Sequence, residues 1–393
     1  MVENRNRWLV CLSTVVGGIS LALVQNKISP IITILMANFK INAQTAGWLS
    51  SIFSLIGVFV ALPASSIIKR IGVKKAGLAS LVIAIIGSLM GVLTNNVVIL
   101  MFSRFIEGMG VGIISVLGPM VITMWFKPEE RGLPMTIWTS WMTISQAILF
   151  FSASPLVKHF TWRGLWWLGI IACAISIVLY SMFVSEPHKV EPQNVTSDRQ
   201  DIVQGVKSLS TWIMALAAFL FTLCSFTFVS WIGNSWARNA NIPLNHVTPL
   251  IGYVYLFEIV YMVIIGFVLD RIPNKKLFGL VAAVIYGIIG LISFNFTKSY
   301  AMIWVMIVLF PFFDGSLPSV IYTLAPLTEK DSRYSPQAIS IMNIGLNAGT
   351  FLAAPLSGAL VDINVNLVGY CFLIVAVCVG ICIAGFKIYD SKN

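Results

Sequence analysis

The sequence has little charge for its length. Only 10% of its 393 residues are Asp, Glu, Lys or Arg, whereas 58% are hydrophobic, and the mean hydropathy is +0.90. A soluble domain carries about 25% charged residues, so this chain cannot cover its surface with polar groups. The composition excludes an ordinary water-soluble protein and indicates a membrane protein with many spans.

Several chemical signals are also missing. The sequence contains no G-x-x-x-x-G-K-[ST] loop, which excludes the usual ATP-binding phosphate loop. The six cysteines fall in apolar segments, none forms C-x-x-C and no histidines gather beside them, so neither disulfides nor a metal site are expected. No Ser or Cys nucleophile is grouped with a His and an acid. We therefore expect neither an enzyme nor a cofactor.

What the sequence does contain is a series of long apolar segments. A membrane helix needs about 20 mostly apolar residues. The segments of that kind run approximately over 8–36, 43–68, 74–94, 97–125, 136–157, 164–184, 211–235, 247–268, 277–294, 300–324, 336–360 and 366–386. The first could be mistaken for a signal peptide, but eleven more follow it. The sequence therefore predicts an all-α integral membrane protein with twelve transmembrane helices.

The basic residues predict the orientation of these helices. Twelve spans place both termini on one side, and the segments on that side hold 18 Lys and Arg, against five on the other side. Lys and Arg collect on the cytoplasmic side of bilayers. We therefore expect the chain to lie in the plasma membrane with both termini in the cytoplasm. The net charge of +10 is mostly this topology signal and gives no reason to expect a nucleic-acid partner.

The chain also repeats itself. The longest polar stretch, residues 185–210, separates six spans in 1–184 from six in 211–393. Across it, "SSIIKRIGVKK" (65–75) reappears as "GFVLDRIPNKK" (266–276) at an offset of 201. Other weak matches keep nearly the same offset, so the sequence predicts two pseudo-symmetric six-helix bundles joined by a cytoplasmic linker. Parallel repeats of this kind occur in one large transporter fold.

The repeated turn resembles a motif of the major facilitator superfamily, G-x-x-x-D-[RK]-x-G-x-[RK]-[RK]. The second copy matches it at Gly266, Asp270, Arg271, Lys275 and Lys276, and the first copy matches at Arg70, Gly72, Lys74 and Lys75. The first copy departs from the motif because Ser65 replaces the glycine and Lys69 replaces the acid.

Three further segments are similar to that family. They are "RFIEGMGVG" (104–112), "TWRGLWW" (161–167) and "MWFKPEERG" (124–132), the last of which resembles a turn of branches that carry anions and carboxylates. The resemblance implies the major facilitator fold, alternating access, and a central cavity lined mainly by helices 1, 4, 7 and 10. It also implies that the two basic turns act in gating. Without the resemblance, both turns can be read as positive anchors on the cytoplasmic side.

Two acids lie deep in the predicted spans. Glu258 is eleven residues from Val247 and twelve from Asp270, about 17 Å from either end of its helix. Asp314 lies between Pro311 and Pro318 in the tenth span. Ionisable groups inside a membrane are costly and often functional, so we expect both carboxylates to carry protons or contact a solute. Structural hydrogen bonding between helices is the alternative.

Three more charged residues lie inside spans. Arg104 and Glu107 share a face of the fourth span and can pair with each other, while the resemblance implies a role for the arginine in proton coupling. Lys27 in the first span could attract an anionic solute, or it could extend toward the outer interface. We therefore include Lys27, Arg104 and Glu107 among the candidate substrate and coupling residues.

Polar and aromatic residues in other spans could line a cavity. The candidates are Gln25, Trp138, Trp141, Trp231, Tyr255, Asn343 and Asn347. Interfacial aromatic belts explain many tryptophans equally well, and hydrogen bonds between helices explain the asparagines.

The combined expectation is a secondary active transporter. We expect it to move a small organic anion together with protons, to sit in a lipid bilayer and to be a monomer. An exporter of cationic or lipophilic compounds is the main alternative, since acids and aromatic rings attract cations. A transporter-like receptor that moves nothing is a third possibility, which the deep carboxylates argue against.

Overall fold

A computed structural model describes residues 2–127, 130–185, 208–328 and 335–386. The side chains of Lys69 and Asp270 lie outside the described part, so the difference between the acid and the lysine in the two basic turns is not addressed by the structure. By its internal contacts the chain divides into two compact units, Met1–Ile41 with Trp48–Pro192 and Asn42–Gly47 with Gln193–Asn393.

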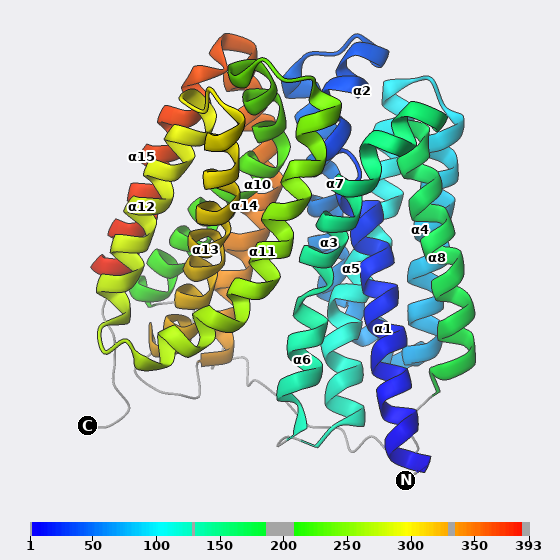
Figure 1. Cartoon of the computed structure of the whole chain (residues 1–393). Helices are drawn as coiled ribbons and strands as arrows, with labels where there is room; N and C mark the ends of the chain where they lie inside the picture. Colours follow the sequence, from blue (N-terminus) through cyan, green and yellow to red (C-terminus); the bar gives the residue numbers. More distant parts are fainter. Residues whose placement is uncertain (1, 128–129, 186–207, 329–334, 387–393) are drawn as a thin grey trace. The chain divides into compact units, whose positions relative to one another are not determined.

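Helices make up both units (Figure 1). The first contains α1 (Val2–Asn26), the 3-10 turn η1 (Ser29–Ile31), α2 (Ile32–Phe39), most of α3 (Ala43–Ile71), α4 (Val73–Leu93), α5 (Val97–Trp125), α6 (Gly132–Thr139), α7 (Trp141–Phe160) and α8 (Arg163–Phe183). The second contains α10 (Leu209–Ala240), α11 (Leu244–Arg271), α12 (Lys275–Asn295), α13 (Tyr300–Leu324), η3 (Ala325–Thr328), α14 (Ser335–Asn364) and α15 (Asn366–Gly385).

These helices follow the apolar segments of the sequence closely. Within the described residues, eleven helical stretches are long and apolar enough to cross a membrane. The 29-residue helix α3 occupies the remaining expected span, 43–68. The prediction of an all-α membrane protein is confirmed for the described part of the chain.

Two of the expected continuous spans are broken. The first span stops at Asn26 and resumes at Ile32, with Pro30 in the 3-10 turn between them. Proline has no N–H to donate to the carbonyl one turn earlier, so it favours a helix end there. The fifth span is interrupted at Ser140, where the Ser140 hydroxyl donates to the carbonyl of Ile137. A local bond of this kind competes with the backbone hydrogen bonds of a helix.

In each unit, glycines allow two crossing helices to approach until their backbones are in contact. A Cβ added to Gly108 or Gly112 of α5 would lie 2.5 Å from a backbone oxygen of α3. In the second unit a Cβ added to Gly345 or Gly349 of α14 would lie still closer, 2.1 and 2.3 Å from backbone oxygens of α10. Small residues at this spacing allow close packing inside membranes, where no hydrophobic effect drives helices together. The glycines of the "RFIEGMGVG" segment therefore have a packing role.

The basic turns cap the last helix of their own unit. Lys74, at the start of α4, donates from Nζ to the carbonyl of Ser181 near the end of α8, at 2.7 Å. Lys276, at the start of α12, donates to the carbonyls of Ala384 and Phe386 at the end of α15. The last four carbonyls of a helix have no partner within the helix, and cations are favoured at this negative end.

Arginines cap two further helix ends in the first unit. The guanidinium of Arg131 donates to the carbonyls of Thr123 and Phe126 at the end of α5, at 2.8 and 3.0 Å. The guanidinium of Arg163 donates to the carbonyl of Val92 at the end of α4, at 2.8 Å. The "WFKPEERG" and "TWRGLWW" segments thus have a structural explanation that involves no solute.

The capping lysines yield a first prediction. Replacing Lys74 or Lys276 with Met should lower the melting temperature in detergent by roughly 2–4 °C, the shift expected for about 1 kcal/mol in a domain of this size. Lys75→Met is the matched control, because Lys75 is exposed at the neighbouring position. An equal shift in all three variants would show that the loss of a basic charge, rather than of the cap, determines stability.

Candidate functional site

In the first unit, the broken end of α1 is held by Arg104 of α5. The guanidinium donates from Nη1 to the carbonyl of Val24 at 2.7 Å and from Nη2 to the carbonyl of Gln25. Its Nε donates to the carbonyl of Leu49 on α3 at 3.2 Å. Because α1 stops at Asn26, these are carbonyls that its own turns do not satisfy. A fixed five-donor cation suits that position.

Glu107 joins this arginine to the lysine beyond the break. Its carboxylate accepts from Nη1 of Arg104, from Nζ of Lys27 at 2.6 Å and from the hydroxyl of Ser88 at 2.7 Å. The ammonium of Lys27 also lies 4.3 Å from the centre of the Trp166 ring. We refer to Lys27, Ser88, Arg104 and Glu107 as the buried cation cluster.

The buried cation cluster carries two positive charges and one negative charge. The side chains of its charged members are 0–1% exposed. The face of Trp166 and the carbonyl end of α1 supply partial negative charge for the excess cation. Most of the donors of Lys27 and Arg104 are already engaged, so few remain for direct contact with another molecule.

In the second unit, Asp314 of α13 is bonded to hydroxyl groups. Its Oδ1 accepts from the Tyr286 hydroxyl at 2.7 Å and its Oδ2 from the Ser225 hydroxyl at 3.3 Å. Among the described residues, no Lys or Arg forms an ion pair with this carboxylate. We refer to Ser225, Tyr286 and Asp314 as the acid–tyrosine cluster.

Aromatic rings enclose the acid–tyrosine cluster. The Tyr286 ring lies 5.1 Å from the rings of Phe310 and Phe372, measured between centroids. Tyr286 itself is fully buried. Asp314 is 9% exposed, so most of its surface is removed from water and its negative charge is costly there.

Glu258 lies on α11 near the same cluster. It is half-buried, and Tyr255 lies within electrostatic reach of both Glu258 and Asp314. Phe257, the residue before this acid, stacks with Tyr261, which lies about one helical turn after the acid, at 6.1 Å between ring centroids. The structure thus brings the two predicted acids into one region of the second unit, with tyrosines beside both.

The tryptophan candidates are packed against protein. Trp138 and Trp141 stack on each other with ring centroids 5.1 Å apart, and both are buried against Gly18 of α1. Trp231 donates from its indole N–H to the Ser357 hydroxyl at 2.9 Å, which joins α10 to α14. In the state described, these rings are engaged in packing.

Other predicted residues are more accessible. Asn343 is half-buried and accepts from the Tyr322 hydroxyl at 3.3 Å, whereas Asn347 is exposed and donates to the Asn343 carbonyl at 2.8 Å. The bond from Tyr322 joins α13 to α14 and fits the interhelical reading, whereas the Asn347 bond lies within α14. The exposure of Asn347 leaves room for solute contact.

The remaining residues of the two basic turns lie near the ends of their helices. Arg70 and Arg271 are exposed, and Lys275 is half-buried. Gly72 has a φ of 85°, a left-handed conformation that a side chain would strain. A Cβ at Gly266 would meet no atom within 4 Å, so no close approach requires glycine there.

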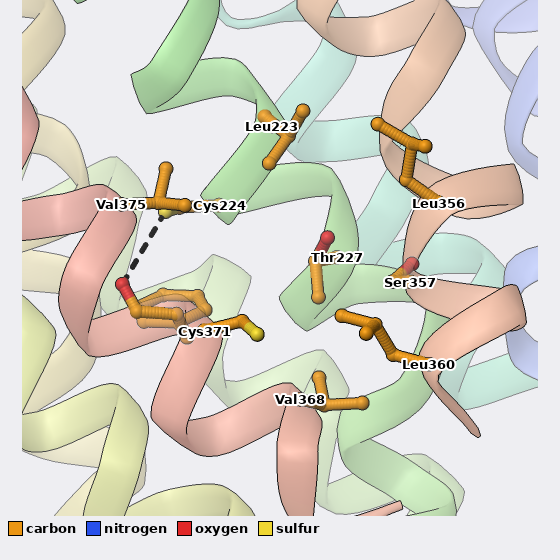
Figure 2. A pocket seen from close by; sticks show the side chains of 10 residues that line it. Leu223, Cys224, Thr227, Leu356, Ser357, Leu360, Val368, Cys371 and Val375 are labelled. Carbon is orange, nitrogen blue, oxygen red and sulfur yellow. Dashed lines mark hydrogen bonds between the residues drawn. The ribbon is translucent and has the colours of Figure 1, made fainter. Parts of the chain in front are cut away.

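A small cavity lies among α10, α14 and α15 (Figure 2). Its volume is about 40 Å³, and apolar side chains such as Leu223, Leu360 and Val375 form much of its wall. Typical ligand sites measure roughly 300–1,000 Å³, so this cavity is too small for a solute. The thiol of Cys224, which lines the cavity, donates to the Phe372 carbonyl at 3.8 Å.

Sequence reasoning missed Ser88, Ser225 and Tyr286 of the two clusters, and it also missed the buried Gln146 of α7. Gln146 is 6% exposed, and among the described residues its Oε1, like that of Gln25, has no hydrogen-bond partner. A lone glutamine in an apolar span was the available signal, but the bonding of its neighbours could not be read from the sequence.

The buried cation cluster predicts an asymmetric response to charge removal. Glu107→Gln leaves two buried cations without their counter-charge and should destabilise the fold by about 3–5 kcal/mol. Lys27→Met keeps the Arg104–Glu107 pair and should cost far less. Thermal unfolding and the monodisperse yield from size-exclusion chromatography measure both. If Lys27→Met lowered stability as much as Glu107→Gln, the negative charge of Glu107 would not be what stabilises the two cations.

Comparisons with known proteins agree with this architecture. The Major Facilitator Superfamily profile matches residues 10–328. A "Protein TsgA homolog" from Buchnera aphidicola subsp. Baizongia pistaciae is 22% identical over 323 residues, 81% of this chain and 77% of that protein. The solved structure of a mutant form of the nucleoside transporter NupG superposes with a TM-score of 0.79 at 12% identity, covering 95% of this chain and 98% of that one.

A third similarity is to a crystal structure of a D-xylose–proton symporter. It covers 98% of both chains, with a TM-score of 0.75 at 13% identity. At this identity the two structural matches establish the fold alone. Together with the family profile, which spans most of the sequence, they lead to one conclusion: the chain belongs to the Major Facilitator Superfamily and is a secondary transporter of that kind.

Proposed function

We propose that this transporter couples the movement of a small organic anion to protons in symport. The observation that carries the proposal is Asp314, a buried carboxylate bonded to the Tyr286 and Ser225 hydroxyls and to no described cation. Protonation would remove the cost of this charge when the site is closed to water. Glu258, half-buried nearby, is the second proton carrier.

The anion preference is supported by the first unit. The buried cation cluster has an excess positive charge inside an apolar helix bundle, and such a field attracts an anion over a distance of several ångströms. Proton uptake by Asp314 would then offset the charge carried by the solute. The similarity to a D-xylose–proton symporter adds support for proton coupling in this fold.

The proposal includes the arrangement of the chain in the membrane. We place twelve helices as two six-helix bundles, 1–184 and 211–393, joined by the linker 185–210, with both termini in the cytoplasm and the chain in the plasma membrane as a monomer. Alternating access follows for a carrier of this kind, because a solute and a proton that bind in one state must be released in another.

A second candidate function is export of cationic or lipophilic compounds. It is favoured by the rings near Glu258, where Tyr261 stacks with Phe257 and meets Phe312 edge-on at 5.6 Å. Acids beside aromatic faces bind organic cations. Export and symport differ in the sign of the solute charge, so one transport panel separates them.

The coupling assignment gives a transport prediction. In proteoliposomes with an imposed pH gradient, Asp314→Asn should abolish accumulation of a transported carboxylate while solute exchange without a gradient continues. Glu258→Gln should weaken accumulation in the same manner. Full accumulation by both variants would overturn the proton role, and accumulation driven by a sodium gradient instead would replace the proton with another cation.

The tyrosine of the acid–tyrosine cluster gives a graded prediction. Tyr286→Phe removes one hydrogen bond to a buried carboxylate, worth about 1–3 kcal/mol, and should reduce gradient-driven uptake several-fold. Tyr180→Phe is the matched control, because Tyr180 is also fully buried but donates to the Val73 carbonyl at 3.4 Å, not to an acid. The two variants would behave alike if the hydroxyl at Asp314 had no part in transport.

A further inference from the structure

Two buried glutamines in the first unit have unused hydrogen-bonding capacity. Gln25 of α1 is 5% exposed and Gln146 of α7 is 6% exposed, and the Oε1 atom of each has no hydrogen-bond partner within the part of the chain that the structure describes. Buried polar groups are nearly always hydrogen-bonded, and leaving one unpaired costs free energy. Two such amides therefore require an explanation.

Both glutamines lie beside the same contact between α1 and α7. Next to Gln25, the amide of Asn26 donates from Nδ2 to the sulfur of Met142 at 3.7 Å. Gln146 lies one helical turn beyond Met142 on α7. Gln25 also shares a face of α1 with Gly18, seven residues earlier, and a Cβ at Gly18 would lie 3.1 Å from the Trp141 ring. Both glutamines therefore come from the stretches of α1 and α7 that pack against each other in the first unit.

The backbone carbonyl of Gln25 is held in place, whereas the Oε1 atom of its side chain has no hydrogen-bond partner among the described residues. Arg104 holds the carbonyl of Gln25 at the broken end of α1. Such support lowers the entropy lost when the side chain binds a ligand. Neighbouring polar side chains are already satisfied, since Asn26 donates to the Ala22 carbonyl at 3.2 Å and Ser145 to the Met142 carbonyl at 2.8 Å. The glutamines alone remain available among these residues.

The unpartnered atoms are acceptors, so the missing group must be a donor. A carboxylate only accepts hydrogen bonds, whereas a hydroxyl can donate to a glutamine oxygen and accept from a glutamine N–H. We propose that Gln25 and Gln146 form a hydroxyl-recognition site and that the transported anion is a hydroxylated carboxylate. The identification of the solute as an anion rests on the proposed function. The hydroxyl site rests on the glutamines alone.

A transport panel of matched solutes tests the site. The probes are lactate against propionate and malate against succinate, with the polyols glycerol and erythritol as neutral hydroxylated compounds. A site built to bond a hydroxyl rejects analogues that lack it, because its polar groups are then left unpaired. Wild-type protein in proteoliposomes should take up at least one hydroxy acid at least about tenfold faster than its deoxy partner, as judged by kcat/KM.

Three variants complete the test. Gln25→Leu and Gln146→Leu should each reduce the hydroxy-to-deoxy preference to within about twofold, mainly by slowing the hydroxylated solute. Ser145→Ala, which removes a satisfied hydroxyl next to Gln146, should keep the preference. Because each leucine replaces an unpaired buried amide, the melting temperature without solute should equal or exceed that of the wild type, which separates lost recognition from lost folding.

The outcomes distinguish the two proposals. Uptake of acids with no preference for the hydroxyl overturns the glutamine site and leaves the anion symporter standing; a trapped water that satisfies both amides would give this result. Uptake of polyols alone, lost in the leucine variants, supports the glutamine site and overturns the anion assignment. Uptake of neither class overturns both proposals. A hydroxyl preference that survives in both leucine variants overturns only the glutamine site.

Discussion

The carbonyl ends of helices are the constraint on which much of this structure depends. A helix leaves its last carbonyls without partners, and an apolar environment offers no water to satisfy them. In this chain cations do so repeatedly. Arg131 and Arg163 cap α5 and α4, Lys74 and Lys276 cap α8 and α15, and Arg104 caps the broken end of α1. Several of the few charged residues therefore serve to satisfy backbone carbonyls at helix ends.

The two charged clusters differ in how completely they are satisfied. In the first unit, Glu107 bonds both cations, and the α1 carbonyls take up donors of Arg104. In the second unit, Asp314 has only hydroxyl partners among the described residues. A saturated cluster shapes the local field and holds the backbone, whereas an unsaturated one can change its state of protonation. This division supports a fixed electrostatic role for the first unit and a proton-carrying role for the second.

The sequence was sufficient to predict the helices, since apolar length alone fixed nearly every boundary to within a few residues. It could not show the break after Asn26, because prolines such as Pro311 and Pro318 remain inside continuous helices. Nor could it show that Trp138 packs against Gly18 or that the Oε1 atom of Gln146 has no hydrogen-bond partner among the described residues. These features depend on which side chains meet across helices, and a span read in isolation does not contain that information. The pairing of Arg104 with Glu107 was predictable because both lie on one helix, whereas the bond of Glu107 to Lys27 joins α5 to the segment that follows α1.

The glycine crossings have a consequence for the history of the fold. Where Gly108 and Gly112 meet α3, and Gly345 and Gly349 meet α10, the helices touch through backbone atoms that every sequence shares. A helix contact of this kind requires small residues at a few positions and places few demands on the other positions. The many lipid-facing positions can then drift, provided that they stay apolar. An ancestral scaffold held in this manner can keep its shape while its sequence diverges, which is consistent with a TM-score of 0.79 at 12% identity.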